Sequence, residues 1–238
     1  MISPKQIEEK TMSPDKRAEA KNSFFGFYVG RPISYVLTVP FLYTNISPNM
    51  VTIISILLAI AGYFILSFGD DVELRLLGLL MFFLWNMGDG IDGNIARYKD
   101  LKSANGDLLD TLGGYIALSL ILLSMGNAAF MDSEGHVFFS RLVPIVLAGI
   151  GTSAALIPRL LMHRKIANEK GNSKIEFLKD KSQYSIAKII MLNICDPAGL
   201  QEVIMFIAIV FHLCTEFTIG YFVINIVILL YSIGSMME

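Results

Sequence analysis

The sequence predicts an all-α integral membrane protein with six transmembrane helices, preceded by a juxtamembrane amphipathic helix. Hydrophobic residues make up 54% of the 238 positions, and the mean hydropathy is +0.58. Several apolar stretches are long enough to cross a bilayer, for which a helix needs about 20 residues. The lysines and arginines gather in a few segments between these stretches, as they do in polytopic membrane proteins.

The first 47 residues are predicted to form a cytosolic tail and the juxtamembrane helix, and residues 48–238 the membrane domain. Residues 1–23 are polar and of mixed charge, which is unlike a cleavable signal peptide. A short helix is expected to begin at Ser13-Pro14.

Residues 24–45 are apolar and aromatic, but Arg31-Pro32 and Pro40 interrupt them. This stretch is too broken to span, so we expect it to lie along the membrane surface. The alternative is that it forms part of the first span.

Six apolar segments follow, and polar or helix-breaking residues separate them. The segments are 48–68, 74–98, 107–125, 139–162, 199–213 and 217–233. The fifth is irregular because residues 186–194 are also apolar and Asp196-Pro197 divides the two parts. Either a short interfacial helix precedes this span, or one long helix kinks at Pro197. Asp196 is expected to cap the helix that follows it.

Positive charge predicts the orientation of the spans. Of the 19 lysines and arginines, 17 fall in residues 1–31, 97–102 and 159–188, and the other two are Arg75 and Arg141. Positively charged loops stay in the cytosol. Both termini and a linker at about 163–185 are therefore predicted to be cytosolic, in the plasma (inner) membrane of a prokaryote.

Four aspartates lie where the second apolar segment ends and the third begins: Asp89, Asp92, Asp107 and Asp110. Carboxylates at a bilayer are costly and indicate a functional site. On a helix, the residues that share one face with Asp89 are Asn86, Asp92, Gly93, Ala96 and Arg97. Asp107, Asp110 and Gly114 share a face of the next helix. Two antiparallel helices would point these faces at each other, at the cytosolic side of the membrane.

Such a pocket would attract divalent cations. Carboxylate ligands without histidine or cysteine favour magnesium, manganese or calcium over zinc, and magnesium often completes its shell with substrate phosphates. Gly93 and Ala96 would let a nucleotide approach the backbone, and the planar fork of Arg97 could bind a phosphate. The residues therefore predict metal-dependent chemistry on a phosphorylated substrate at the cytosolic interface.

One long motif resembles the signature of the CDP-alcohol phosphotransferases (CDP-alcohol phosphatidyltransferases). It reads Asp89-x2-Asp92-Gly93-x2-Ala96-Arg97-x8-Gly106-x3-Asp110. The earlier segment Pro48-Asn49-x2-Thr52 is also similar to that family. The resemblance implies an enzyme of phospholipid or related phosphodiester biosynthesis, in which an alcohol attacks the substituted phosphate of a CDP-linked donor and CMP is released.

The resemblance also implies roles for individual residues. Asp89, Asp92 and Asp110 would hold Mg²⁺ (or Mn²⁺), as two ions. The nucleotide site would be lined by Gly93, Ala96, Arg97 and Gly106. The implied partners are a CDP-linked donor, an alcohol acceptor and membrane lipid, with no nucleic acid. Family members are commonly homodimers, and Gly149-x3-Ser153 offers a small-residue packing face.

The sequence departs from the family signature at Gly114, where a fourth aspartate is expected. In the family that aspartate is a metal ligand and the proposed general base, and glycine can be neither. Asp107 and Glu202 are candidate replacements, although Asp107 lies about 10 Å away along the helix axis. Alternatively, Asp107 is an acid favoured by the helix dipole, and Glu202 is an interfacial residue.

Gly114 therefore motivates a second hypothesis, a non-catalytic member that binds a CDP-alcohol or metal as a partner or sensor. A cation transporter is a third possibility, since intramembrane acids also line ion paths. Transporter sites tend to lie near the membrane midplane, whereas these acids lie at one end of their helices.

Overall fold

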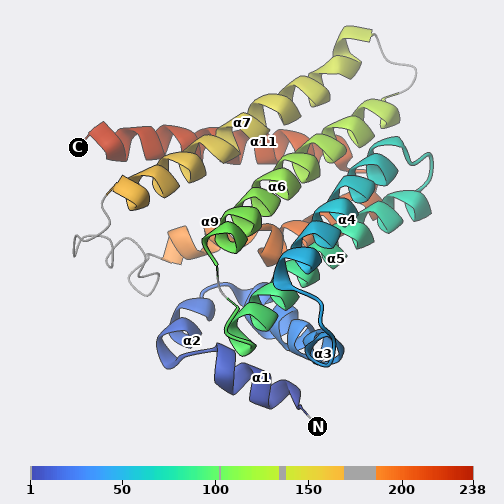
Figure 1. The fold of residues 1–238 in the computed structure, drawn as a ribbon. Coiled ribbons are helices and arrows are strands. Elements are labelled where there is room, and N and C mark those ends of the chain that lie inside the picture. The colour runs from blue at the N-terminus through green and yellow to red at the C-terminus, as the bar shows by residue number, and fades with distance from the viewer. Residues whose placement is uncertain (1, 102, 134–137, 169–185, 238) are drawn as a thin grey trace. The chain divides into compact units, whose positions relative to one another are not determined.

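The computed structural model describes residues 2–101, 103–133, 138–168 and 186–237, and every regular element in these ranges is a helix (Figure 1). Among them, five helices are long and apolar enough to cross a membrane, or up to six if one bent pair forms a single span. This confirms the predicted all-helical membrane class. The count of six, the orientation and the boundary at residue 48 stay predictions, and most of the linker at 163–185 lies outside the described residues.

The long helices follow the predicted spans closely. They are α4 (Pro48–Phe68), α5 (Val72–Tyr98), α6 (Ala104–Asp132), α7 (Phe138–Asn168) and α11 (Cys214–Met237). The bounds of α4 are those predicted from the sequence. Helix α6 begins at Ala104 rather than Asp107, because the hydroxyl of Ser103 accepts a hydrogen bond of 3.0 Å from the amide of Gly106.

The predicted fifth span is divided at Asp196. Helix α9 (Ile186–Cys195) ends there, and the π-helical turn η3 (Pro197–Gln201) leads into α10 (Glu202–Val210). Asp196 has extended backbone dihedrals, and its carboxylate accepts a hydrogen bond of 3.1 Å from the amide of Ala198. The predicted cap is thus confirmed, and the two helical parts do not form one continuous kinked helix.

Contacts divide the chain into two compact units, which are described separately. The first comprises residues 1–61, 80–117 and 181–202, and the second comprises 62–79, 118–180 and 203–238.

The amino-terminal segment of the first unit is more structured than a tail. It forms α1 (Pro4–Thr11), α2 (Pro14–Ala20), the π-helical η1 (Gly26–Gly30) and α3 (Arg31–Leu42). Helix α2 begins at the predicted proline. Helix α1 was not expected, although Ser3 and Gln6 cap it reciprocally.

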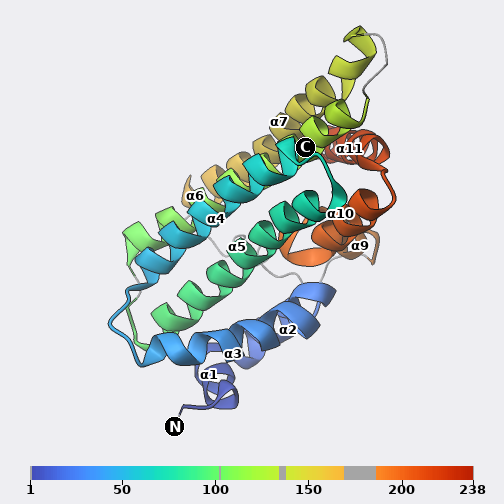
Figure 2. The ribbon, with the colours of Figure 1, turned by 90° about the vertical axis from the view of Figure 1, so that its right-hand side faces the viewer.

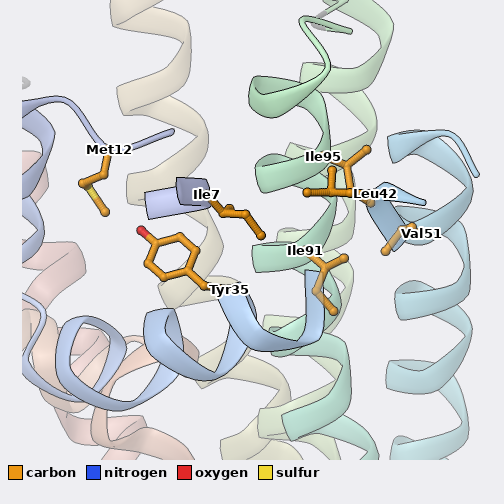
Figure 3. Packing of buried hydrophobic residues seen from close by; sticks show 7 residues of the cluster. All are labelled: Ile7, Met12, Tyr35, Leu42, Val51, Ile91 and Ile95. Atoms are coloured by element: carbon orange, nitrogen blue, oxygen red, sulfur yellow. The ribbon is translucent and has the colours of Figure 1, made fainter. Parts of the chain in front are cut away.

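This segment is fixed by an apolar cluster drawn in Figure 3. The cluster joins α1, α3, α4 and α5, and its buried members are Ile7, Met12, Tyr35, Leu42, Val51, Ile91 and Ile95. Ile7 and Ile95 are fully buried, and burying one such side chain contributes about 1.5–3 kcal/mol. The amino-terminal helices are therefore packed onto the motif-bearing part of α5.

Helix α3 runs beside the carboxyl-terminal half of α5 (Figure 2). The two backbones approach closely at Gly90, where an added Cβ would lie 2.9 Å from the Cβ of Ser34. The face of α3 toward α5 contains small polar residues, while Ile33, Val36 and Leu37 are exposed. Apolar side chains that point outward suit contact with lipid, which supports the proposed juxtamembrane position.

The second unit is held by polar contacts as well as by apolar packing. The buried Arg75 forms an ion pair of 2.6 Å with Asp132. The amide of Asn127 donates hydrogen bonds to Tyr63 Oη and Ser67 Oγ, at 3.1 and 3.2 Å. Helices α7 and α11 lie side by side (Figure 1).

Candidate functional site

The first unit contains a cavity of about 950 Å³. Its wall is built by the amino-terminal segment, the start of α4, the end of α5, the start of α6 and the region around α9. The predicted site residues on the wall are Asp89, Asp92, Gly93, Ala96, Arg97, Gly106, Asp107 and Asp110. A volume of this size is in the range of small-molecule and cofactor sites. The structure thus brings together every residue predicted to hold metal or nucleotide.

The acidic face of α5 is anchored by α4. Asp89 is exposed, whereas Asp92 is only 4% exposed. The hydroxyl of Thr52 donates a hydrogen bond of 2.5 Å to Oδ2 of Asp92. A buried carboxylate needs such a partner, and the contact fixes Asp92 in the wall of the cavity.

The carboxylates of α5 and α6 lie close together, as predicted from their positions on the facing sides of two helices. Asp89 lies close enough to Asp92 and Asp110 to interact electrostatically with both. Like charges held this close repel, and a divalent cation would offset the repulsion. The donor types therefore fit Mg²⁺ or Mn²⁺. Within the described part of the chain, however, no three histidine, cysteine or acidic side chains are already arranged as a metal site.

Arg97 lies over Gly93, as the helical spacing suggests. A Cβ at Gly93 would be 2.9 Å from both Nη1 and Nη2 of Arg97. The guanidinium also donates a hydrogen bond of 3.2 Å to Oδ1 of Asn94. In turn, Asn94 donates to Thr38 at 3.1 Å and to Ser34 at 3.4 Å, both on α3. A polar chain from the amino-terminal segment therefore orients Arg97 at the cavity.

The start of α6 closes another part of the wall. A Cβ added to Gly106 would lie 3.1 Å from Oδ1 of Asn49 on α4, so a larger residue would press on that side chain. Asp107 lines the cavity in the first turn of α6. This position is compatible with a replacement for the missing fourth aspartate and also with an acid favoured by the helix dipole. Gly114 is not part of the wall, and a Cβ added there would meet nothing within 4 Å.

Glu202 lies outside the cavity wall. It is 5% exposed, and neither carboxylate oxygen has a hydrogen-bond partner among the described residues. Its carboxylate interacts with Asn86, which lines the cavity and donates a hydrogen bond of 3.3 Å to the carbonyl of Pro197. Glu202 is therefore connected to the site through Asn86 and does not face it directly.

The sequence did not indicate how the amino-terminal segment is held at the site. Asn193 on α9 is buried, and its Oδ1 accepts a hydrogen bond of 2.7 Å from the amide of Phe24. Its Nδ2 donates to the carbonyls of Asn22, at 2.6 Å, and Ile189, at 2.8 Å. An isolated asparagine in an apolar stretch gives no signal of such a role, because its partners are remote in sequence.

Comparisons with known proteins found a family and a relative. Residues 45–230 match the family described as CDP-alcohol phosphatidyltransferase. An uncharacterized protein of Aquifex aeolicus (strain VF5) is 32% identical over 113 residues, which are 47% of this chain and 55% of that relative. The match thus spans about half the length of the relative. Because the family match includes the whole acidic motif and most of the chain, the protein belongs to the CDP-alcohol phosphatidyltransferase family.

Proposed function

We propose that this protein is an integral-membrane CDP-alcohol phosphotransferase that acts in phospholipid or related phosphodiester biosynthesis. It would transfer a substituted phosphate from a CDP-linked donor to an alcohol and release CMP. The observation that supports this proposal is the cavity of about 950 Å³ onto which the signature residues of both α5 and α6 open. The charge distribution supports a cytosolic active site, and the bacterial relative supports a prokaryotic plasma membrane.

The residues suggest how the donor is bound. Asp89, Asp92 and Asp110 would hold the divalent cations, and Thr52 keeps Asp92 oriented toward the cavity wall. Bound Mg²⁺ would polarise the diphosphate and stabilise the charge that develops on the leaving group. Arg97 donates to phosphate oxygens. Gly93 and Ala96 leave room for the nucleotide, and Gly106 lines the same site.

The transfer requires one bond to form and one to break. The acceptor oxygen bonds to the phosphorus that bears the donor's alcohol, the bridging P–O bond to CMP breaks, and the hydroxyl proton passes to a base. Of the two candidate bases, Asp107 lines the cavity and Glu202 does not. Asp107 is therefore the better placed of the two.

Measurement of CMP release tests the proposal. Purified full-length protein in lipid would be incubated with Mg²⁺, with CDP-diacylglycerol or CDP-linked headgroups, and with a panel of alcohols. We expect CMP only when a metal, a donor and an acceptor are all present. The absence of CMP with every combination, both for the natural protein and for Gly114→Asp, would contradict the proposal.

Gly114 supports a second candidate function, a family member that binds a CDP-alcohol or metal without turnover. Thermal stabilisation by CDP and Mg²⁺ without CMP release would support this candidate. Any metal-dependent CMP release by the unmodified protein would exclude it.

A homodimer is a separate proposal. Gly149 and Ser153 occupy one face of α7, where Ser153 is exposed and a Cβ at Gly149 would meet nothing within 4 Å. Cross-linking of the protein in lipid would test it.

A further inference from the structure

We propose that Arg31 and Arg97 together form a phosphate-binding subsite in the cavity. Arg97 belongs to the acidic motif, but Arg31 lies in the amino-terminal segment, outside the residues that match the family. The proposal deepens the proposed function by adding a substrate-binding residue from that segment. The identity of the molecule that carries the phosphate rests on the proposed function. The binding of an anion by the two arginines does not, since it can be measured without turnover.

Both arginines line the cavity, and they come from different helices. Arg31 is the first residue of α3, and Arg97 lies in the last turn of α5. Both residues are half-buried, and they are close enough to interact electrostatically. Ser34, one turn after Arg31, lines the same wall.

The two guanidinium groups retain unused donors. Among the described residues, the salt bridges join Arg17 to Glu8 and Arg75 to Asp132, so neither cavity arginine forms one. The Nη1 atom of Arg31 contacts the sulfur of Met12 at 4.0 Å, which is a weak hydrogen bond at most. Since a guanidinium has five N–H donors, most of those on Arg31 are free to bind a ligand.

Electrostatics favours an anion at this position. Arg97 is attracted by Asp92 and Asp110, but it is repelled by Arg31, and both arginines are partly withdrawn from water. A phosphate bound between the two arginines would replace their mutual repulsion with attraction to the anion. Arginine forks bind phosphate bidentately, with charge-assisted hydrogen bonds.

The hydroxyl group of Tyr35 is a second polar group near Arg97 that lacks a hydrogen-bond partner among the described residues. This residue is 5% exposed, and it interacts with Arg97. Figure 3 shows the hydroxyl on the side of Tyr35 that faces Met12. Buried hydroxyl groups are normally hydrogen-bonded, so Tyr35, which belongs to the apolar cluster and does not itself line the cavity, leaves one polar group unsatisfied near Arg97.

The phosphate could belong to either of two molecules. It could be part of the diphosphate of the CDP-linked donor, or it could be a phosphate on the acceptor alcohol. In both cases the ligand is a phosphate held by two arginines, in the same cavity as the metal-binding carboxylates.

The test compares Arg31→Gln and Arg31→Lys with a matched control, Arg17→Gln, in the full-length protein. Arg17 belongs to the same segment, but it is exposed, does not line the cavity and pairs with Glu8. An exposed pair of this kind contributes little to stability. The probes are CMP, CDP, inorganic phosphate and glycerol 3-phosphate, with binding followed by calorimetry and by thermal unfolding.

We expect Arg31→Gln to weaken phosphate binding about 10- to 100-fold, since a hydrogen bond to a charged group contributes about 1.5–3 kcal/mol. Arg31→Lys should retain part of the affinity, because it keeps the charge and loses the fork. Arg17→Gln should bind every probe normally. If Arg31→Gln binds all probes as the natural protein does, the subsite is excluded. If Arg31→Gln fails to fold, unchanged binding by folded Arg31→Lys excludes the bidentate subsite.

The probes also distinguish the two sources. A loss of affinity for CDP that exceeds the loss for CMP assigns the subsite to the donor. Unchanged CDP binding with loss of glycerol 3-phosphate binding assigns it to a phosphorylated acceptor. These results do not depend on CMP release, so failure of the subsite and failure of the proposed enzyme activity are separate outcomes.

Discussion

Thr52 on α4 and Asp92 on α5 are joined by a hydrogen bond of 2.5 Å between Oγ1 and Oδ2. Thr52 also contacts the carbonyl of Pro48 in its own helix, at 3.1 Å. The start of α4 is thereby fixed to a proposed metal ligand, although the two residues are 40 positions apart. This contact joins the segment Pro48-Asn49-x2-Thr52 to the acidic motif.

Thr52→Val should weaken metal binding at Asp92. Valine has nearly the same shape but cannot donate a hydrogen bond, and loss of a residue that orients a ligand typically costs about 10- to 100-fold in metal affinity. Titration of Mg²⁺ in the presence of CDP would measure the change. Thr111→Val is the control, since among the described residues the hydroxyl of Thr111 bonds to the carbonyl of Asp107 in its own helix. Equal Mg²⁺ affinity in both variants would contradict the prediction.

Removal of the metal or of its proposed ligands should abolish stabilisation by CDP. A ligand present at 100 times its dissociation constant stabilises a protein by about 2.7 kcal/mol. CDP should therefore raise the unfolding temperature of the natural protein in the presence of Mg²⁺. We expect this rise to disappear when EDTA is added, and also in each of the variants Asp89→Asn, Asp92→Asn and Asp110→Asn.

The control for these variants is Asp100→Asn. Asp100 is exposed, does not line the cavity and has a φ of 56°, a conformation that asparagine tolerates. Stabilisation by CDP that survives both EDTA and all three cavity variants would show that these aspartates bind no metal.

Gly114→Asp should fold normally and raise the rate of CMP release. A Cβ at this position meets nothing within 4 Å, so the larger side chain has room. It would lie one helical turn beyond Asp110. General-base catalysis contributes about 10²- to 10⁴-fold. Gly114→Asn is matched in size and lacks the basic carboxylate, so a rate gain shared by both variants would argue against a base at this position.

Gly93→Ala should weaken CDP binding without unfolding the protein. The new methyl group would displace the guanidinium of Arg97, which now lies 2.9 Å from its position. Because that group is the end of a flexible side chain, it can move, and the cost falls on phosphate binding, about 10- to 100-fold. Calorimetric titration with CDP measures the change.

The matched control is Gly220→Ala, in α11, where an added Cβ meets nothing within 4 Å. Alanine is favoured over glycine in a helix by about 1 kcal/mol. This variant should bind CDP normally and be at least as stable as the natural protein. If Gly93→Ala behaves in the same way, Arg97 does not bind the nucleotide phosphate.

Asn193→Ala should release the amino-terminal segment from α9. The change removes three hydrogen bonds and leaves the amide of Phe24 without its partner, at a cost of about 1–3 kcal/mol. We expect a lower unfolding temperature and faster proteolysis within residues 20–26. Asn225→Ala is the comparison, because the side chain of Asn225 bonds only to Tyr221 within α11. It should leave proteolysis in residues 20–26 unchanged.

The sequence alone predicted the long helices well, because length and continuous apolar character determine them. The bounds of α4 agreed at both ends, and α5 differed by two residues at its start. The spacing of Asp89, Asp92 and Asp110 also placed them on facing helix surfaces, since the helical repeat and a short turn leave little freedom. The role of each aspartate stays a prediction.

The tertiary structure decided what completes the cavity. Residues 1–23 looked like a tail because they are polar and contain no span, yet Ile7 is fully buried against α5 and Thr11 lines the cavity. Likewise, Glu202 was a candidate for the site by its position in the chain, but the structure places it behind Asn86. Such relations depend on contacts between residues remote in sequence, and no local periodicity encodes them. The sequence by itself determined a helical membrane protein with an acidic motif on two helices, because the helical repeat and the hydropathy are local properties. Only the packing of α1, α3 and α9 on that motif decided which other side chains share the cavity.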